Sequence, residues 1–324
     1  MTVATTRHTA TAGTPSPTDS RSARSAGTVS RILRERWMYL FIVPGVAYFV
    51  IFQYVPLFGN LVAFKNYSPF LGFNASPWVG LQNFTDLFSD PEFLTALKNT
   101  ALISLMQILF AFPAPIALAL MLNSLISEKA KRLVQSVVYL PHFFGWVIVI
   151  SIWQAVLGGV GPMASLLNSL GHGHENVMAD PHTFLALVTA QVVWKEVGWG
   201  TIIFFAAISA IPVERYEAAA VDGANSFRRM WHVTLPGISN VIVLLLILRL
   251  GTVLSVGFEQ LLLQQDAVGS GAAEVLDTFG YYRGVIGGQW GLATAAGLFK
   301  GVIGTVLVIS ANRIAKRTGS GGLF

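Results

Sequence analysis

The sequence contains no cysteine and very few charged residues. Of its 324 residues, 11% are charged and 53% are hydrophobic, whereas soluble domains carry about 25% charged residues. Without cysteine there can be no disulfide, thiolate zinc site, iron–sulfur cluster or cysteine nucleophile. The phosphate-binding motif GxxxxGK[ST], the metal motif HExxH and any recognisable pairing of a nucleophile with a base are also missing. We therefore predict a membrane protein that is not an enzyme and does not itself hydrolyse ATP.

The first 30 residues are rich in serine, threonine and alanine, carry several arginines and contain one acid, Asp19. Such a segment has too little apolar content to fold. We predict that residues 1–36 form a disordered cytoplasmic tail. The same composition also describes an organelle transit peptide, whereas a secretory signal is disfavoured because the first apolar run, from Trp37, is too long.

Six stretches have the length and composition of membrane-spanning helices, for which about 20 mostly apolar residues are needed. They cover residues 37–64, 99–125, 133–157, 183–211, 238–263 and 292–311. Backbone groups in lipid must be satisfied within the segment, so these stretches are predicted to be helices. Prolines at 113, 115 and 141 interrupt two of them, which would permit either bending during transport or simple packing kinks.

The basic residues predict an orientation. With the amino terminus in the cytoplasm, only Lys65, Lys98 and Arg283 fall outside, while Lys195, Arg249 and Lys300 fall within spans. All other lysines and arginines then lie on the cytoplasmic side, as the positive-inside rule expects. This places both termini in the cytoplasm, and it explains the net charge of +5 without nucleic acid.

A compact charged insert, YEAAAVDGANSFRRMWHVTLP at residues 216–236, separates the fourth and fifth stretches. Pro212 and early glutamates favour a helix start, and Gly223 favours a helix end. Ser226 is a candidate cap for a second short helix that leads to Pro236. The small alanines would let another backbone come close. From these residues alone the insert is either a docking site for a soluble protein or an ordinary amphipathic loop.

The spacing E-A-A, three residues, Gly223, nine residues and V-T-L-P closely resembles the EAA loop of ABC importer permeases. Only Val233 departs from the family pattern, where isoleucine is usual. The resemblance implies that the first helix is a coupling helix, which docks on a cytoplasmic ATPase. The matching or flanking residues are Glu217, Ala218, Ala219, Asp222, Gly223, Ala224, Leu235 and Pro236.

Further blocks extend this resemblance over residues 35–324: SPWVGLQNF at 76–84, FPAPIALAL at 112–120, YLPHF at 139–143 and LRLGTVLSVGFEQ at 248–260. They are similar to the carbohydrate-uptake, LplB-type branch. The implied fold is the all-α, type I importer permease with six membrane helices. The transmembrane domain would cover residues 37–316, with a coupling loop at 211–237 and a cytoplasmic tail at 317–324. The implied partners are a homologous second permease, two ATPase subunits that bind the ATP, and an extracellular solute-binding protein.

Polar residues within the spans are candidates for the substrate path. Arg249 would serve either in that path or in a structural ion pair, since a charge inside a membrane faces protein or water. The other candidates are Gln191, Trp194, Glu196, Glu259 and Gln260. Sugar sites combine an aromatic face with hydrogen-bonding groups, although tryptophan and lysine also anchor helices at the membrane interface.

The loop GHGHENVMADPH contains His172, His174, Glu175 and His182. We expect it to be a solvated loop rather than a metal site. Two rival functions stay open: a secondary transporter driven by an ion gradient, which would need intramembrane ionisable relays, and a non-transporting membrane scaffold or intramembrane enzyme.

Overall fold

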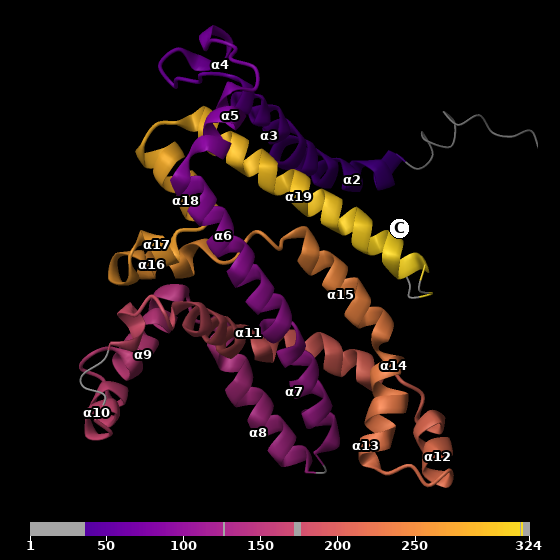
Figure 1. Ribbon diagram of the computed structural model, residues 1–324. Coiled ribbons are helices and arrows are strands. Elements are labelled where there is room, and N and C mark those ends of the chain that lie inside the picture. The colour runs from indigo at the N-terminus through magenta and orange to yellow at the C-terminus, as the bar shows by residue number, and fades with distance from the viewer. Residues whose placement is uncertain (1–35, 126, 172–175, 318, 320–324) are drawn as a thin grey trace, which may run out of the picture. The chain divides into compact units, whose positions relative to one another are not determined.

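The computed structural model describes residues 36–125, 127–171, 176–317 and 319. Among these residues the chain is helical, and its extended pairing is limited to one isolated bridge between Lys65 and Trp78. Residues 1–35 of the predicted tail at 1–36, and residues 318 and 320–324 of the predicted tail at 317–324, lie outside the described residues. The chain divides into two units, residues 1–58 and 59–324, which are described separately. Figure 1 labels their helices.

The first unit contains α2 (Arg36–Phe49), the π-helical turn η1 (Val50–Tyr54) and α3 (Val55–Leu57). It carries no charged side chain from Trp37 on, and large apolar groups such as Phe41 are exposed. Exposed apolar side chains are what a lipid-facing helix presents. The uncharged run Trp37–Phe64 qualifies as a membrane span by length and composition, as predicted.

The second unit opens with the 3-10 helix η2 (Phe58–Phe64) and two short helices, α4 (Gly72–Ala75) and α5 (Gln82–Ser89). The Asn83 side chain fixes this region, because its Nδ2 donates to the carbonyls of Ala63 and Lys65 at 2.8 and 3.0 Å. The loop therefore has a defined conformation although it contains little regular structure.

The second span begins earlier than predicted, at Pro91 rather than at residue 99. Asp90 caps α6 (Pro91–Met106) by accepting from the Glu92 backbone N–H at 2.9 Å, and a proline at the first helical position needs no donor. The helix continues through the π-helical turn η3 (Gln107–Ala111) into α7 (Pro113–Ser124). The widened turn directly precedes Pro113, where the ring would otherwise clash with the preceding turn.

The predicted third span, residues 133–157, is wrong at its start. A separate amphipathic helix, α8 (Glu128–Tyr139), ends in the 3-10 turn η4 (Leu140–Phe143), and the apolar helix α9 begins only at Trp146. Pro141 and the extended Gly145 separate the two helices. The candidate span is Trp146–Ser169, formed by α9 (Trp146–Leu157) and α10 (Pro162–Ser169).

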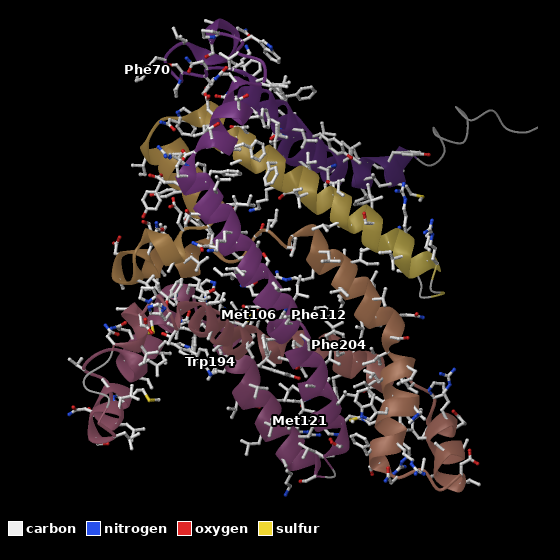
Figure 2. The ribbon with its side chains drawn as sticks, in the orientation of Figure 1. Phe70, Met106, Phe112, Met121, Trp194 and Phe204 are labelled. Carbon is white, nitrogen blue, oxygen red and sulfur yellow. The ribbon has the colours of Figure 1, made fainter. Side chains whose placement is uncertain are left out.

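The fourth span is one unbroken helix, α11 (Phe184–Ser209), which follows the short turn η5 (Val177–Ala179). Lys195 does not interrupt it, because the buried ammonium donates to the His142 carbonyl at 2.7 Å. α11 packs closely along α7, and a T-shaped contact between Phe112 and Phe204 joins them, with ring centroids 6.4 Å apart (Figure 2).

The predicted fifth span, residues 238–263, is wrong at its end. The helix α15 runs only from Ser239 to Gly251, and residues 252–257 are not helical. Gly257, with φ of 114°, then starts a separate helix, α16 (Phe258–Val268). α17 (Ser270–Ala273), α18 (Leu276–Gly280) and the π-helical turn η7 (Tyr281–Ile286) follow. An apolar run therefore conceals a helix break.

The sixth span lies within α19 (Trp290–Arg317), which packs against α15 and α18. By length and composition the described residues contain five membrane helices, or six if the bent helix pair Ser226–Gly237 and Ser239–Gly251 is counted as one span. The predicted all-α architecture with six spans is confirmed at this level.

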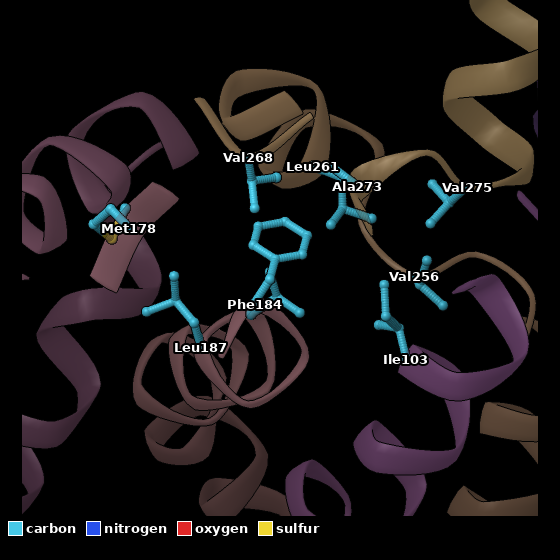
Figure 3. Close-up of a cluster of buried hydrophobic side chains, with 10 residues drawn as sticks. Ile103, Met178, Phe184, Leu187, Val256, Leu261, Val268, Ala273 and Val275 are labelled. Carbon is cyan, nitrogen blue, oxygen red and sulfur yellow. The ribbon is translucent and has the colours of Figure 1, made fainter. Parts of the chain in front are cut away.

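Two kinds of contact hold α16–α18 to the neighbouring spans. The first is apolar: Phe184 and Leu187 of α11, Ile103 of α6, and Leu261 and Val268 of α16 belong to one buried cluster (Figure 3). Within a membrane such a cluster holds helices together mainly by van der Waals packing.

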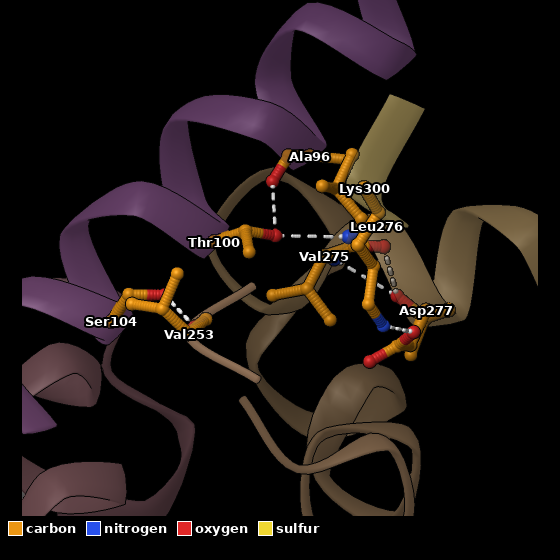
Figure 4. A network of polar contacts seen from close by, with 9 residues as sticks. Ala96, Thr100, Ser104, Val253, Val275, Leu276, Asp277 and Lys300 are labelled. Carbon is orange, nitrogen blue, oxygen red and sulfur yellow. Dashed lines mark hydrogen bonds and ion pairs between the residues drawn. The ribbon is translucent and has the colours of Figure 1, made fainter. Parts of the chain in front are cut away.

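The second kind of contact is polar (Figure 4). The buried Thr100 hydroxyl accepts from the Leu276 N–H at 2.9 Å, and Ser104 donates to the Val253 carbonyl at 2.5 Å. Lys300 of α19 forms an ion pair with Asp277 of α18. The two hydroxyl contacts satisfy backbone groups at a helix start and a helix break, which lipid could not do, and the ion pair lets each of its charges meet the other.

Candidate functional site

The first candidate site is the insert, residues 211–237. Its first helix, α12 (Val213–Val221), starts after Pro212, which lies at the cap position. None of its residues is buried: Glu217 and Ala218 are exposed and Ala219 is half-buried. A helix of this kind has a free surface on which another protein could dock.

Gly223 terminates α12 as predicted. Its φ of +77° lies in the left-handed region, which glycine adopts without penalty. The Ala224 N–H donates to the Ala219 carbonyl at 2.9 Å, and the Gly223 N–H donates to the Ala220 carbonyl at 3.0 Å. This pair of bonds is a Schellman motif, which satisfies the last carbonyls of the helix. Asp222 is the exposed C-cap residue.

The second helix of the insert is capped one residue earlier than predicted. The Asn225 side chain, not that of Ser226, accepts from the Arg228 N–H at 2.9 Å. α13 (Ser226–Arg229) continues as the π-helical turn η6 (Met230–Thr234) and α14 (Leu235–Gly237), which contains the predicted motif residues Leu235 and Pro236. Phe227 and Trp231 of this segment are exposed.

One polar contact ties the two helices of the insert together. The Tyr216 hydroxyl lies 3.1 Å from the Thr234 hydroxyl, which is buried. Beside this contact is a cavity of about 420 Å³ that is lined in part by Asn123, Phe227 and Met230. The two helices of the insert are thus held together by this contact, and the cavity lies next to it.

The two ends of the insert meet at Ile211 and Gly237. A Cβ atom on Gly237 would lie 2.6 Å from Cδ1 of Ile211, so glycine allows the close approach. Directly after Gly237 the chain bends by 57° into α15. The insert is therefore joined to α11 and α15 at a narrow neck.

The second candidate site is a cavity of about 420 Å³ between η3, α7, α11 and α15. Arg249 of α15 lies on its wall and donates a hydrogen bond to Oε1 of the buried Gln107. The amide in turn donates to the Val256 carbonyl at 3.0 Å. A charged side chain at the centre of a span costs about 2.5–3.5 kcal/mol on insertion scales, so a position beside a cavity and an amide is the expected solution.

Glu196 lies on the wall of the same cavity. One of its carboxylate oxygens, Oε2, is 2.8 Å from Nδ1 of His142, and the other, Oε1, is 3.4 Å from the Lys195 ammonium. The His142 ring stacks on Trp199, with centroids 4.4 Å apart and an angle of 4° between the planes. Glu196, His142, Lys195 and Trp199 thus form a connected polar and aromatic group beside the cavity.

Four predicted path residues lie elsewhere. Gln191 and Gln260 are fully buried and bond to each other at 2.7 Å within a glutamine cluster that includes Gln264. Neither amide is among the residues that line the cavity around Arg249. Trp194 packs edge-on against Trp153, and Glu259 is exposed on α16.

Three residues of this site were not singled out from the sequence as candidates: Gln107 and Trp199 on the cavity wall, and His142, which stacks on Trp199. His142 lies in the YLPHF block, next to a predicted proline break, which is the sequence signal that could have indicated it. Gln107 carries no such signal, since its partner Arg249 is 142 residues away.

A cluster of charges lies at the start of the second span. Arg283 bonds to Asp90 at 2.7 Å and to Glu92 at 2.9 Å. The pKa of the nearby Glu274 is raised, first by desolvation and then by the charges of Glu92 and Asp90, against the opposing effect of Arg283. This cluster stabilises the connection between the second span and η7.

Part of the histidine loop can be described. His172, His174 and Glu175 lie outside the described residues. The His182 N–H donates to the Asp180 carboxylate at 3.0 Å, which is the largest of the interactions that lower the pKa of Asp180. In the described part of the chain we find no group of three side chains that could hold a metal ion.

Comparison with known proteins identifies the chain. Residues 111–320 match the family described as "Binding-protein-dependent transport system inner membrane component". Protein LplB of Bacillus subtilis (strain 168) is 44% identical over 297 residues, covering 91% of this chain and 93% of LplB. The polygalacturonan/rhamnogalacturonan transport system permease protein YteP of the same organism is 43% identical over 295 residues, covering 91% and 92%.

The fold is likewise that of a solved transporter. One chain of a bacterial alginate ABC transporter, in complex with an alginate pentasaccharide-bound periplasmic protein, matches with a TM-score of 0.84 and 35% identity, covering 91% of this chain and 99% of that chain. The chain therefore belongs to the family of inner-membrane components of binding-protein-dependent transport systems, and it is a multi-pass ABC transporter permease rather than an enzyme.

Proposed function

We propose that this chain is one of two permease subunits of an ATP-driven importer for oligosaccharides. The complex would contain a homologous second permease, two cytoplasmic ATPase subunits and an extracellular sugar-binding protein. ATP would be bound by the ATPase subunits, and this chain would need no cofactor and no catalytic residue. Both termini, including the tails at 1–36 and 317–324, would lie in the cytoplasm, as the distribution of basic residues favours.

The exposed helix α12 is the observation that carries the ATPase-coupling part of the proposal. Glu217 and Ala218 are on its surface, and the Schellman motif at Gly223 fixes its end. Small alanine side chains allow a groove on the ATPase to approach the helix backbone. The Tyr216–Thr234 contact and the neck at Gly237 would pass movement of α12 to α15.

Two observations support the carbohydrate part. Relatives at 43–44% identity include one that is named for polygalacturonan and rhamnogalacturonan transport, and the solved relative imports alginate. The cavity between η3, α11 and α15 combines the Trp199 ring with the polar groups of Glu196, Arg249 and Thr252. An aromatic face among hydrogen-bonding groups is what a sugar ring requires. The buried Gln191 and Gln260, with Trp194 and Glu259, would reach the substrate only in another conformation.

Transport would depend on the difference in how strongly the ATPases hold two conformations of the permease pair. A ligand shifts such an equilibrium only by its differential affinity for the two states. ATP binding by the partners would favour one state through α12, and hydrolysis would release it. No chemical step would take place at the insert.

The test is a charge reversal on α12 with a matched control. Glu217→Arg should abolish copurification of the ATPase and ATP-dependent uptake, while Asp266→Arg, which reverses an exposed carboxylate on α16, should keep both. Membrane insertion of both variants should be normal. Normal ATP-dependent uptake by Glu217→Arg would refute coupling through α12. Uptake that survives ATP depletion and stops with an ionophore would favour a secondary transporter.

A further inference from the structure

We propose that Arg249 selects anionic oligosaccharides by binding a sugar carboxylate in the cavity between η3, α11 and α15. This inference rests on the proposed function. It adds that the substrate is anionic and that Arg249 recognises its charge.

The guanidinium of Arg249 has no counterion among the residues that the structure describes. Within the described part of the chain, the guanidinium donates one hydrogen bond, to Oε1 of Gln107, which is an uncharged amide. A guanidinium carries five N–H donors in a planar fork. The remaining donors are available to a ligand, and they suit the two oxygens of a carboxylate.

Glu196 is the one acidic side chain among the described residues that line the cavity, and it does not neutralise Arg249. Its oxygen Oε2 is taken by His142 at 2.8 Å, and its oxygen Oε1 faces the Lys195 ammonium at 3.4 Å. The Lys195–Glu196 pair is neutral as a whole, so Arg249 leaves the cavity with a surplus of positive charge. An unpaired cation favours an anionic ligand over a neutral one, and the preference grows as the site is shielded from water.

The cavity also has the size and the walls for a sugar unit. Its volume is about 420 Å³, within the usual range for small-ligand sites. Trp199 lies on the wall with its ring backed by His142, and Thr252 offers a hydroxyl one helical turn beyond Arg249. A uronate ring could contact the aromatic side chain while its carboxylate meets the guanidinium. A neutral sugar would leave the cation without a partner.

The experiment measures uptake by the complete transporter in proteoliposomes, with ATP inside and the sugar-binding protein outside. The probes are galacturonate and mannuronate tetramers, each beside its carboxyl-reduced neutral counterpart. The readout is the ratio of acidic to neutral uptake. Because the binding protein is the same for every variant, a change in this ratio arises in the permease.

Two variants remove the surplus charge in different ways. Arg249→Gln deletes the cation, and Thr252→Asp places a carboxylate one turn away while keeping the Arg249–Gln107 bond. Thr252→Asn is the matched control, because asparagine has nearly the size of aspartate but carries no charge. We expect both charge-removing variants to lower the acidic-to-neutral ratio by on the order of 10- to 100-fold, as for the loss of a charge-assisted hydrogen bond. Thr252→Asn replaces the hydroxyl without adding charge, so it should change acidic and neutral uptake by the same factor, and it is the reference for Thr252→Asp.

The outcomes separate this inference from the proposed function. An unchanged ratio in both charge-removing variants, or a wild-type transporter that imports neutral tetramers as well as acidic ones, would overturn the role of Arg249 while leaving carbohydrate import intact. The same results are expected if the second permease supplies an acidic side chain that neutralises Arg249, and they would overturn the inference in that case too. Failure to import any of the four sugars, with ATP still hydrolysed, would overturn the carbohydrate function itself. If Arg249→Gln does not assemble, the comparison of Thr252→Asp with Thr252→Asn decides.

Discussion

Replacement of Gly223 should uncouple ATP hydrolysis from transport in a graded way. The residue has φ of +77°, and a Cβ atom there would meet nothing within 4 Å. Gly223→Ala therefore causes backbone strain without a steric clash, about 1–2 kcal/mol for a left-handed conformation. That amount changes the population of the intact helix end by roughly 5- to 30-fold. Gly223→Asn should cost less, because asparagine tolerates this conformation better.

Gly223→Pro should have the largest effect. Proline fixes φ near −65° and removes the N–H that donates to the Ala220 carbonyl, so about 3 kcal/mol or more is lost. We expect the yield of copurified ATPase to be highest for the wild type and to fall progressively in Gly223→Asn, Gly223→Ala and Gly223→Pro. ATP-dependent uptake should fall in the same order. The assay is uptake in proteoliposomes together with the yield of the purified complex.

Gly80→Ala provides the control for general strain. Gly80 also has a positive φ, +62°, and open space at its Cβ position, but it lies in the loop before α5. The change should lower thermal stability by a similar amount without loss of ATPase binding. Equal uptake by Gly223→Pro and the wild type would refute the role of the Schellman motif in coupling.

Three further predictions test the contacts around both sites. Tyr216→Phe removes the hydroxyl that contacts Thr234, so ATP-dependent uptake should fall while insertion into the membrane is unchanged. The folded protein should lose about 0.5–1.5 kcal/mol of stability, which would be measured as a lower melting temperature. An unchanged melting temperature together with unchanged uptake would contradict this prediction. Gly198→Ala would place a Cβ atom 2.0 Å from a backbone carbonyl oxygen of α8, so the yield of folded protein should drop sharply. The control, Gly297→Ala, has open space around the new Cβ atom and should fold normally. Equal yields of the two variants would show that the close helix contact at Gly198 is not needed. Glu274→Gln should raise the stability of the folded protein at neutral pH, because the raised pKa of Glu274 means that the folded state disfavours the carboxylate. The wild type regains this stability as the pH falls through the raised pKa, so in melting experiments at a series of pH values the advantage of the variant should shrink on acidification. An advantage that grows on acidification would refute the assignment.

The sequence predicted the features that depend on neighbouring residues. The uncharged run after Trp37 and the stop at Gly223 follow from local composition and backbone preference, and both agree with the structure. The orientation prediction rests on charge counts alone and remains a prediction. The EAA spacing led to the correct family because it joins residues that lie within one short insert.

Two span boundaries could not be predicted because apolar composition does not show where a helix breaks. Residues 252–263 are mostly apolar, but the positive φ of Gly257 starts a new helix there. In the third span, Pro141 suggested a kink, whereas together with Gly145 it separates two helices. In both cases the break lies at a glycine or proline whose conformation the apolar composition does not reveal.

The partner of Arg249 illustrates the other limit. The guanidinium was recognised as unusual within a span, but its bond to Gln107 joins α15 to a turn of the second span. Only the packing of η3, α11 and α15 brings these groups together around one cavity. Local sequence rules contain no information about such contacts.

The neck of the insert has a mechanical consequence. Because Ile211 and Gly237 touch, the segments that leave the insert toward α11 and α15 share one pivot. A displacement of α12 by a few ångströms would then turn two membrane helices about the same point rather than stretch a flexible tether. The 57° bend after Gly237 would set the direction in which such a torque reached α15.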